Sequence, residues 1–443
     1  MIVLGCSFIG INLFLRNDKT IVKASFEKAF KQAKNTLQLT KKKTLQYDLE
    51  KESIGVNAKL SFESDYKSED IDLSKLKDYE MLFHYAIAKK DNKASANFQL
   101  NHPENGLDIK SYIEGKNAYI TLGDLSQKIL SFELEKEIKD IKATDVDFED
   151  IEKILKVTEK TTLDFIKEKD ISSKEVEKEI HGKKGKYKQI TYQINVNEYL
   201  YSLLSAYRYD EEILEIISKL TDTKKYEIEE EIKNTMKELK NDKSDDKIII
   251  NTYLSGIISK VQALEIIIEN DSLWIEMDNK NYIFKAYERE EEVFNGSYKV
   301  DNTTTTLELK VPNEQEKILI KAKNLGNDKY HMNIEYTDEE YNLSFDIDGK
   351  ETVNSSSQEI DSKVKVSYKD SVEDFSITLN YNIDIEKDAK VEEMDTSNST
   401  NIENIEETEY YDILSKLEKK IESIINDISP NLEENNSILY RFI

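Results

Sequence analysis

The stretch that decides the fold is LEIIIENDSLWIEMDNKNYIFKAYE, residues 264–288. Apolar and polar residues alternate along it, and Asp278-Asn279 interrupts the alternation with turn-forming residues. The apolar positions are Leu264, Ile266, Ile268, Leu273, Ile275, Met277, Tyr282, Phe284 and Ala286. A period of two is typical of antiparallel strands that bury one face and expose the other to water. The stretch therefore predicts successive antiparallel strands with one apolar face.

The same alternation extends on both sides, from Ile248 to about Ile385. Turn-forming residues recur within it, at Asn295-Gly296, Gly326-Asn327-Asp328 and Asp348-Gly349, and we expect a hairpin turn at each. The resulting strands are too many to remain flat, because each strand twists relative to its neighbour. A wide, curved meander is expected.

The N-terminal half predicts a helix followed by a second meander. Val22, Phe26, Phe30, Ala33 and Leu37 recur at helical spacing and form one apolar stripe. Alternating positions follow from Leu45 to Ile109, and we expect the leading helix to cover them. Helical spacing returns at 147–169, a basic hairpin follows at 175–196, and two helices are predicted at 199–220 and 226–239.

We therefore predict an α+β fold with two antiparallel, curved, half-barrel-like β-meanders, each covered by helices. The expected divisions are an N-terminal apolar anchor or truncated signal segment (1–17), a helix-plus-sheet domain (18–145), helices with the basic hairpin (146–245), a large sheet domain (246–386), an acidic linker (387–408) and a C-terminal amphipathic helix (409–443). The last helix has an apolar stripe that needs a cover, either the concave side of the sheet or a protein partner.

Composition excludes several classes of protein. The chain has 443 residues and a formal net charge of −26, so its surface repels the phosphates of nucleic acids, and no nucleic-acid partner is expected. A single Cys excludes an intrachain disulfide framework and a Cys-based zinc site. No cofactor is predicted.

Residues 2–15 form the one continuous apolar run. A helix of this length spans about 21 Å, less than the ~30 Å of a bilayer core, and the first cation, Arg16, follows the run. We interpret the run as an uncleaved membrane anchor and suspect that a cationic leader precedes Met1. The alternatives are a lipidated Cys6, because Val3-Leu4-Gly5-Cys6 resembles a lipobox, and a buried first element. The protein is expected on the extracytoplasmic face of the membrane.

No motif indicates catalysis or metal binding. The sequence contains no HExxH, GxGxxG, GxxxxGK[ST] or GxSxG pattern, and its four histidines are scattered at His84, His102, His181 and His331. Asp346-Ile347-Asp348-Gly349 looks like part of a calcium loop, but its Gly follows the second Asp directly. We predict no catalytic residue and no metal site, so the protein is not expected to be an enzyme.

The order of elements resembles a known group. An apolar leader, a helix, a meander, the segment GKKGKYKQITYQINVNEYLYSLL (182–204), a helix pair and a long second meander resemble uncharacterised surface proteins of low-GC Gram-positive bacteria. More distantly, the helix-plus-curved-sheet pattern over most of 20–385 is similar to LolA-like and LppX-like half-barrel lipoproteins. That resemblance implies an apolar cavity between sheet and helices that holds an acyl chain.

Two functions follow as expectations. The first is a membrane-anchored, non-enzymatic binding protein that takes an apolar ligand or lipid in a sheet–helix groove. The proposed lining residues, chosen by register and size, are Trp274, Phe284, Phe345 and Phe375. The alternative is a non-catalytic surface scaffold with filled cores, whose C-terminal helix docks a protein partner.

Overall fold

The computed structural model describes residues 17–428 except 43, 50, 68–71, 139–147, 222, 243, 245, 257–259, 279–280, 302 and 313. The described residues form two compact units. Unit 1 combines Met1–Lys42 with Thr144–Leu319, and unit 2 combines Lys43–Ala143 with Ile320–Ile443. Cys6 and the apolar run of the predicted anchor lie outside the described residues. No helix in the described part of the chain is sufficiently long and apolar to cross a bilayer.

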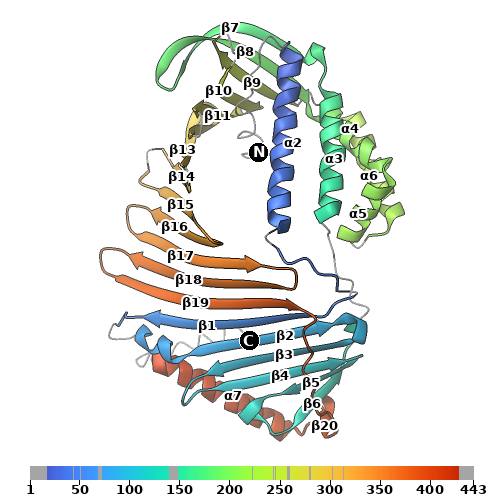
Figure 1. Ribbon diagram of the computed structural model, residues 1–443, viewed down its shortest axis with the longest axis vertical. Helices are drawn as coiled ribbons and strands as arrows, with labels where there is room; N and C mark the ends of the chain where they lie inside the picture. Colours follow the sequence, from blue (N-terminus) through green and yellow to red (C-terminus); the bar gives the residue numbers. More distant parts are fainter. Residues whose placement is uncertain are drawn as a thin grey trace. The chain divides into compact units, whose positions relative to one another are not determined.

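The helices of unit 1 follow the predicted stripes closely, with one exception. They are α2 (Asp18–Lys42), α3 (Phe148–Phe165), α4 (Val196–Arg208), α5 (Glu211–Thr221) and α6 (Lys225–Asn241) (Figure 1). The single helix expected at 199–220 is two helices, because Asp210 begins a new one. Its Oδ1 accepts hydrogen bonds from the backbone N–H groups of Glu212 (3.1 Å) and Ile213 (3.2 Å), which is N-cap chemistry.

The sheet of unit 1 is a curved antiparallel meander in which each strand pairs with the next (Figure 1). Its strands are β7 (Ile171–Ile180), β8 (Lys183–Asn195), β9 (Lys247–Ser255), β10 (Lys260–Ile268), β11 (Asp271–Asp278), β12 (Asn281–Glu288), β13 (Glu291–Asp301) and β14 (Thr304–Lys310). The alternation of residues 264–288 thus forms β10, β11 and β12, as predicted.

The apolar face of this sheet is covered by α2. Ile21, Val22 and Phe26 of the helix belong to one buried cluster with Leu264, Ile275 and Phe284 of the strands. The ring centroids of Phe26 and Tyr192 lie 6.2 Å apart at an interplanar angle of 85°. This edge-to-face contact and the burial around it account for the N-terminal part of the apolar stripe of α2, at Val22 and Phe26.

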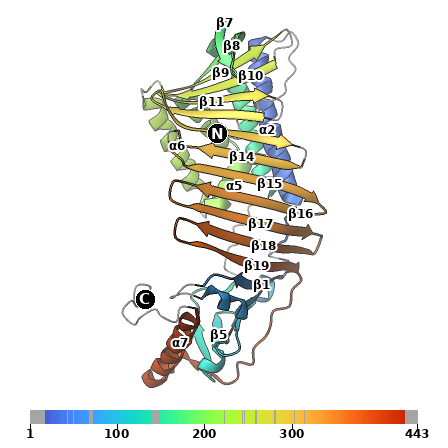
Figure 2. The same ribbon diagram turned by 90° about the vertical axis from the view of Figure 1, so that its left-hand side faces the viewer.

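The strands of unit 2 come from both ends of the chain and pair side by side (Figure 2). Their order is β16 (Lys329–Thr337), β17 (Asn342–Val353), β18 (Ser357–Lys369), β19 (Asp374–Lys387), β1 (Ile54–Ser64), β2 (Glu80–Ala88), β3 (Lys93–Asn101), β4 (Leu107–Glu114), β5 (Asn117–Thr121), β6 (Ile129–Glu133) and β20 (Ser399–Asn401). All neighbours are antiparallel except β6 and β20, and β15 (Lys317–Gly326) contains the boundary between the units.

The protein is therefore α+β with a large, mostly antiparallel, curved open sheet, but the finer prediction of two half-barrel-like meanders is not confirmed. Leu60 of β1 pairs with Tyr381 of β19 on one side and with Met81 of β2 on the other. The strands expected in the domain at 18–145 thus share a sheet with those of 246–386. The leading helix belongs to unit 1, not to the meander that follows it.

The predicted acidic linker packs on the sheet of unit 2. Ala389 and Val391 are buried against Ala86, Ala88 and Tyr112. The backbone N–H of Glu392 donates to Oγ of Ser95 at 3.0 Å, and β20 follows within the same segment. Its small apolar residues, rather than its acidic composition, decide this position, because they fit over the alanines of β2.

The C-terminal helix is α7 (Glu407–Ile428), and it contacts two short 3₁₀ helices, η1 (Leu73–Asp78) and η3 (Gly123–Leu125). Asp427 accepts a hydrogen bond from the hydroxyl of Tyr79 at 3.1 Å. Ile413 is buried, whereas Tyr410 and Tyr411 are about half exposed. The helix thus packs on the connections between the strands of unit 2, and only part of its surface is buried.

Two of the expected turns are strand residues. Gly296 lies inside β13 opposite Phe284, and Gly349 lies inside β17 opposite Tyr330. A Cβ at Gly296 would lie 2.5 Å from the ring of Phe284, and a Cβ at Gly349 would lie 2.2 Å from the ring of Tyr330. Each glycine leaves room for an aromatic ring from the neighbouring strand, which is a known use of glycine within strands.

Candidate functional site

Phe345 and Phe375 lie on the same face of the unit 2 sheet. Phe345 pairs with Ile334 and Val366, and Phe375 pairs with Tyr368. Directly paired residues of antiparallel strands point to one face, and the register repeats every second residue. Both phenylalanines are therefore part of a continuous apolar surface across β16–β19.

We call this surface the β16–β19 apolar face. Its aliphatic and aromatic centre consists of Met332, Ile334, Leu343, Phe345, Ile347, Val364, Val366, Ile377 and Leu379. Each of these side chains is only partly buried, in contrast to the apolar face of unit 1. A contiguous, incompletely buried apolar surface of this kind is uncommon on a monomeric protein, which makes it the candidate site in unit 2.

A row of aromatic rings bounds one end of the face. Its members are Tyr336, Tyr341, Tyr368, Phe375 and Tyr66, and successive ring centroids are 5.1–5.8 Å apart. The hydroxyl of Tyr368 donates to Asp370 at 2.8 Å, and this hydrogen bond to a carboxylate raises the pKa of the tyrosine. The hydroxyl of Tyr66 likewise donates to Glu373 at 3.2 Å, so these two tyrosines combine an apolar ring with a polar contact at the ring's end.

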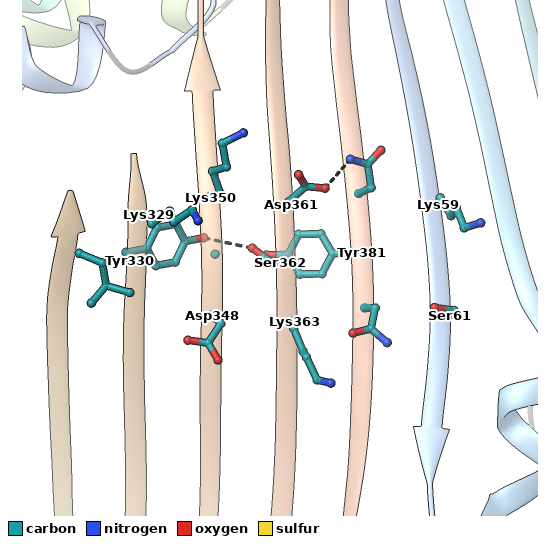
Figure 3. Close-up of a pocket in the computed structure, with 14 residues that line it drawn as sticks. Lys59, Ser61, Lys329, Tyr330, Asp348, Lys350, Asp361, Ser362, Lys363 and Tyr381 are labelled. Carbon is teal, nitrogen blue, oxygen red and sulfur yellow. Dashed lines mark hydrogen bonds between the residues drawn. The ribbon is translucent and has the colours of Figure 1, made fainter. Parts of the chain in front are cut away.

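Two further tyrosines, Tyr330 and Tyr381, bound the other end. Tyr330 lies over Gly349, its hydroxyl is 3.2 Å from Oγ of Ser362, and Ser362 pairs with Tyr381 in the sheet. Figure 3 shows the rings of Tyr330 and Tyr381 on either side of Ser362. A hollow of about 460 Å³ is lined by these residues and their strand neighbours. The Tyr330 position depends on Gly349, which the sequence had indicated as a turn.

The other two predicted lining residues lie in unit 1 and on opposite faces of its sheet. Trp274 pairs with Lys285, the neighbour of Phe284, so the two aromatic side chains point in opposite directions. Phe284 belongs to the filled core under α2, and Trp274 packs with Ile180, Tyr253 and Ala263 on the other side. They do not line a common groove. The sequence already indicated that Trp274 points away from the apolar face, because it lies between Leu273 and Ile275, which are the apolar positions of that strand.

Around Trp274 the surroundings are polar. Its indole Nε1 donates to Oε1 of Glu276 at 3.1 Å, and the ammonium of Lys178 lies 4.7 Å from the ring centroid. Burial, together with a hydrogen bond to Glu265, raises the pKa of the neighbouring Tyr253, so this hydroxyl stays protonated and acts as a donor.

The histidines are dispersed, as expected, and each has a local partner. His84 lies 2.5 Å from Asn57, His102 stacks on Tyr79, His181 contacts Glu276, and His331 contacts Asp348. Within the described ranges no three His, Cys, Asp or Glu side chains are grouped so that they could hold a metal ion.

Comparisons with known proteins identify no relative. No protein-family model matches the chain, and no curated protein matches it. Among solved structures, the chain is similar to a mutant of the vaccine antigen transferrin binding protein B from Haemophilus parasuis Hp5, with 10% identity, coverage of 76% of each chain and a TM-score of 0.14. Intact Ap-TbpB, with its N and C lobes, has 8% identity, coverage of 76% of this chain and 77% of that chain, and a TM-score of 0.12. TM-scores this low carry no argument about fold or function.

Proposed function

We propose that the protein is a non-enzymatic, extracytoplasmic binding protein, anchored to the membrane through its N-terminal segment, that holds an apolar ligand or lipid on the β16–β19 apolar face. The observation that carries the proposal is the incomplete burial of this face. Phe345, Val366 and Ile377 form its centre, and all three remain partly accessible. Covering them with a ligand would remove apolar surface from water, worth about 25 cal/mol per Å².

The shape of the face favours an elongated ligand. Four neighbouring strands at about 4.8 Å spacing and the stretch from Tyr330 to Tyr336 at about 3.4 Å per residue give a patch about 20 Å long in one direction and about 15 Å in the other. Tyrosine rings bound it at both ends, and their hydroxyls could take a polar head group while the aliphatic centre takes the chain.

A fluorescence titration of the full chain tests the proposal. N-phenyl-1-naphthylamine is a suitable probe because it is apolar and uncharged, so a protein of net charge −26 does not repel it. We expect the probe to brighten on binding and an apolar lipid extract to displace it. Lipid extraction of protein purified from its native membrane would then identify the ligand.

Two neighbouring residues provide a matched pair of variants. Val366 lies on the β16–β19 apolar face, and Ser367, next to it on β18, points to the opposite, polar face. Val366→Glu should weaken probe binding about tenfold or more, because it buries a carboxylate in the ligand contact. Ser367→Glu adds the same charge and should leave binding nearly unchanged. Equal effects of the two substitutions would contradict the proposed position of the site.

A second function, a non-catalytic scaffold, is favoured by a different observation. The core of unit 1 is filled around Phe284, and α7 presents Tyr410 and Tyr411 at 49% and 59% exposure. Exposed tyrosines are common at protein interfaces. A protein partner that binds the full chain and loses affinity on Tyr411→Ala, with no apolar probe bound on β16–β19, would favour the scaffold.

A further inference from the structure

The tip of the β7–β8 hairpin folds over the face of unit 1 that carries Trp274. β8 pairs with β9 only from Lys188 onward. The hairpin tip, which precedes Lys188 on β8, therefore extends past the end of its pairing with β9. There the backbone N–H of His181 donates to Oε2 of Glu276 at 2.8 Å, and Nε2 of His181 lies 3.2 Å from the carbonyl oxygen of Met277. Ile180 is buried beside Trp274. The hairpin tip is thus docked on β11.

This tip places a lysine over two aromatic rings. The ammonium of Lys178 lies 4.7 Å from the ring centroid of Trp274 and 5.4 Å from that of Tyr253, and the two ring centroids are 5.2 Å apart. Both ammonium distances are within the ~6 Å at which a cation is attracted by an aromatic face. Two rings and a cation in this arrangement form the kind of cage that binds organic ammonium groups.

A fixed carboxylate completes the cage. Oε2 of Glu265 accepts hydrogen bonds from the hydroxyl of Tyr253 (2.7 Å) and from Nδ2 of Asn251 (2.8 Å). Its Oε1 lies 3.8 Å from the ammonium of Lys178, which is a long distance for an ion pair. The carboxylate is therefore held in place by other residues and does not need Lys178 to position it.

A hollow of about 1010 Å³ adjoins the cage, and Lys178, Glu265 and Trp274 are part of its lining. Carboxylates outnumber cations there: the lining includes Glu179, Glu265, Glu269, Glu276 and Glu290, against Lys178, Lys285 and Arg289. Such a lining attracts cations. The side chain of Lys178 is 41% exposed, so its ammonium can exchange the cage for water without leaving a buried charge.

We propose that Trp274, Tyr253 and Glu265 form a binding site for a small organic ammonium ion, and that Lys178 occupies this site until such a ligand displaces it. The hydrogen bond from Trp274 to Glu276 fixes the plane of the indole, and the hairpin tip supplies the displaceable lysine. The site lies in unit 1, so the proposal is independent of ligand binding on the β16–β19 apolar face.

Trp274 is the single tryptophan of the chain, so its fluorescence reports on this site alone. The full chain is titrated with choline, and the variant Lys178→Ala is compared with Lys285→Ala. Both substitutions remove one positive charge from the same hollow. The ammonium of Lys178 lies over the two rings, whereas that of Lys285, the neighbour of Trp274 on β12, is paired with Glu292 at 3.7 Å. We expect Lys178→Ala to bind choline about tenfold more tightly than the unsubstituted chain, and Lys285→Ala to bind it nearly as the unsubstituted chain does.

An uncharged isostere of choline, with a tert-butyl group in place of the trimethylammonium group, tests the ligand class. It should bind Lys178→Ala at least tenfold more weakly than choline, because it lacks the charge that the rings and Glu265 attract. Equal binding of the two compounds would overturn the proposal, as would equal choline affinity of the two lysine variants. If circular dichroism shows that Lys178→Ala is unfolded, Lys178→Gln, which keeps the aliphatic stem, takes its place in the same comparison.

Discussion

The apolar face of β8–β12 in unit 1 and that of β16–β19 in unit 2 have the same alternation of residues and differ in burial. In unit 1, Leu264, Ile275 and Phe284 lie in a closed cluster with residues of α2. In unit 2, the equivalent positions, such as Phe345 and Val366, remain half-buried. The difference teaches that a period of two predicts which side chains share a face, whereas the cover of that face comes from elements distant in sequence.

The largest expected effect is on the core of unit 1. Phe284→Ala should destabilise unit 1 by about 3–5 kcal/mol, because it leaves a cavity in a closed cluster. Phe345→Ala should cost unit 2 about half of this or less, since the site is open to water on one side. Hydrogen exchange, followed by mass spectrometry of peptides from each unit, measures the two losses separately. Equal losses of stability in the two units would contradict the proposed difference in burial between their apolar faces.

Substitution of the two strand glycines should also cost more stability in unit 1, at Gly296, than in unit 2, at Gly349. A Cβ at Gly296 would lie 2.4 Å from the carbonyl oxygen of Glu308, a backbone atom that cannot move aside, so Gly296→Ala should cost about 1–3 kcal/mol. At Gly349 the nearest atoms belong to the ring of Tyr330, which can swing away from the sheet. Gly349→Ala should cost about 1 kcal/mol or less and should release the hydroxyl of Tyr330 from Ser362. Exchange of the β13 and β17 peptides gives the readout, and a larger loss at Gly349 would reverse the interpretation.

The smallest expected effect is on the stability of unit 2 at acidic pH. Hydrogen bonds from Lys67 and Ser74 lower the pKa of Asp72 in unit 2 to about 2, below the ~3.9 of an unfolded chain. Its folded pKa is depressed, so its contribution to stability is present above about pH 4 and is lost as the pH falls toward 2. Asp72→Asn should therefore remove part of the acid sensitivity of unit 2 and none of that of unit 1. Unit-resolved hydrogen exchange between pH 5 and 2.5 checks this, and unchanged acid sensitivity of unit 2 in the variant would count against it.

Much of the secondary structure could be predicted, because it depends on neighbours in the chain. The stripe from Val22 to Leu37 gave α2, and the alternation of residues 264–288 gave three strands with the expected apolar face. Asn295-Gly296 and Asp348-Gly349 were predicted wrongly as turns. Each glycine is required by an aromatic ring on the adjacent strand, and that ring is not among its neighbours in sequence.

The candidate sites, too, could be predicted only where they depend on neighbours in the chain. Phe345 and Phe375 could be assigned to one face from register alone, but Tyr330 with Ser362, and Lys178 with Trp274, are brought together by strand pairing and by the folded-over hairpin. Local patterns carry no information on such pairs, because the backbone hydrogen bonds of one strand fit many partners.

The sequence by itself determined the α+β composition of the protein, the polarity of each sheet face and the acidic surface, because periodicity and charge are local properties. Only the tertiary structure decided that β1 lies between β19 and β2, that α2 covers the sheet of unit 1, and that the face of β16–β19 stays half open. These features depend on contacts between residues up to several hundred positions apart, whose free energy is gained only when the whole chain has collapsed.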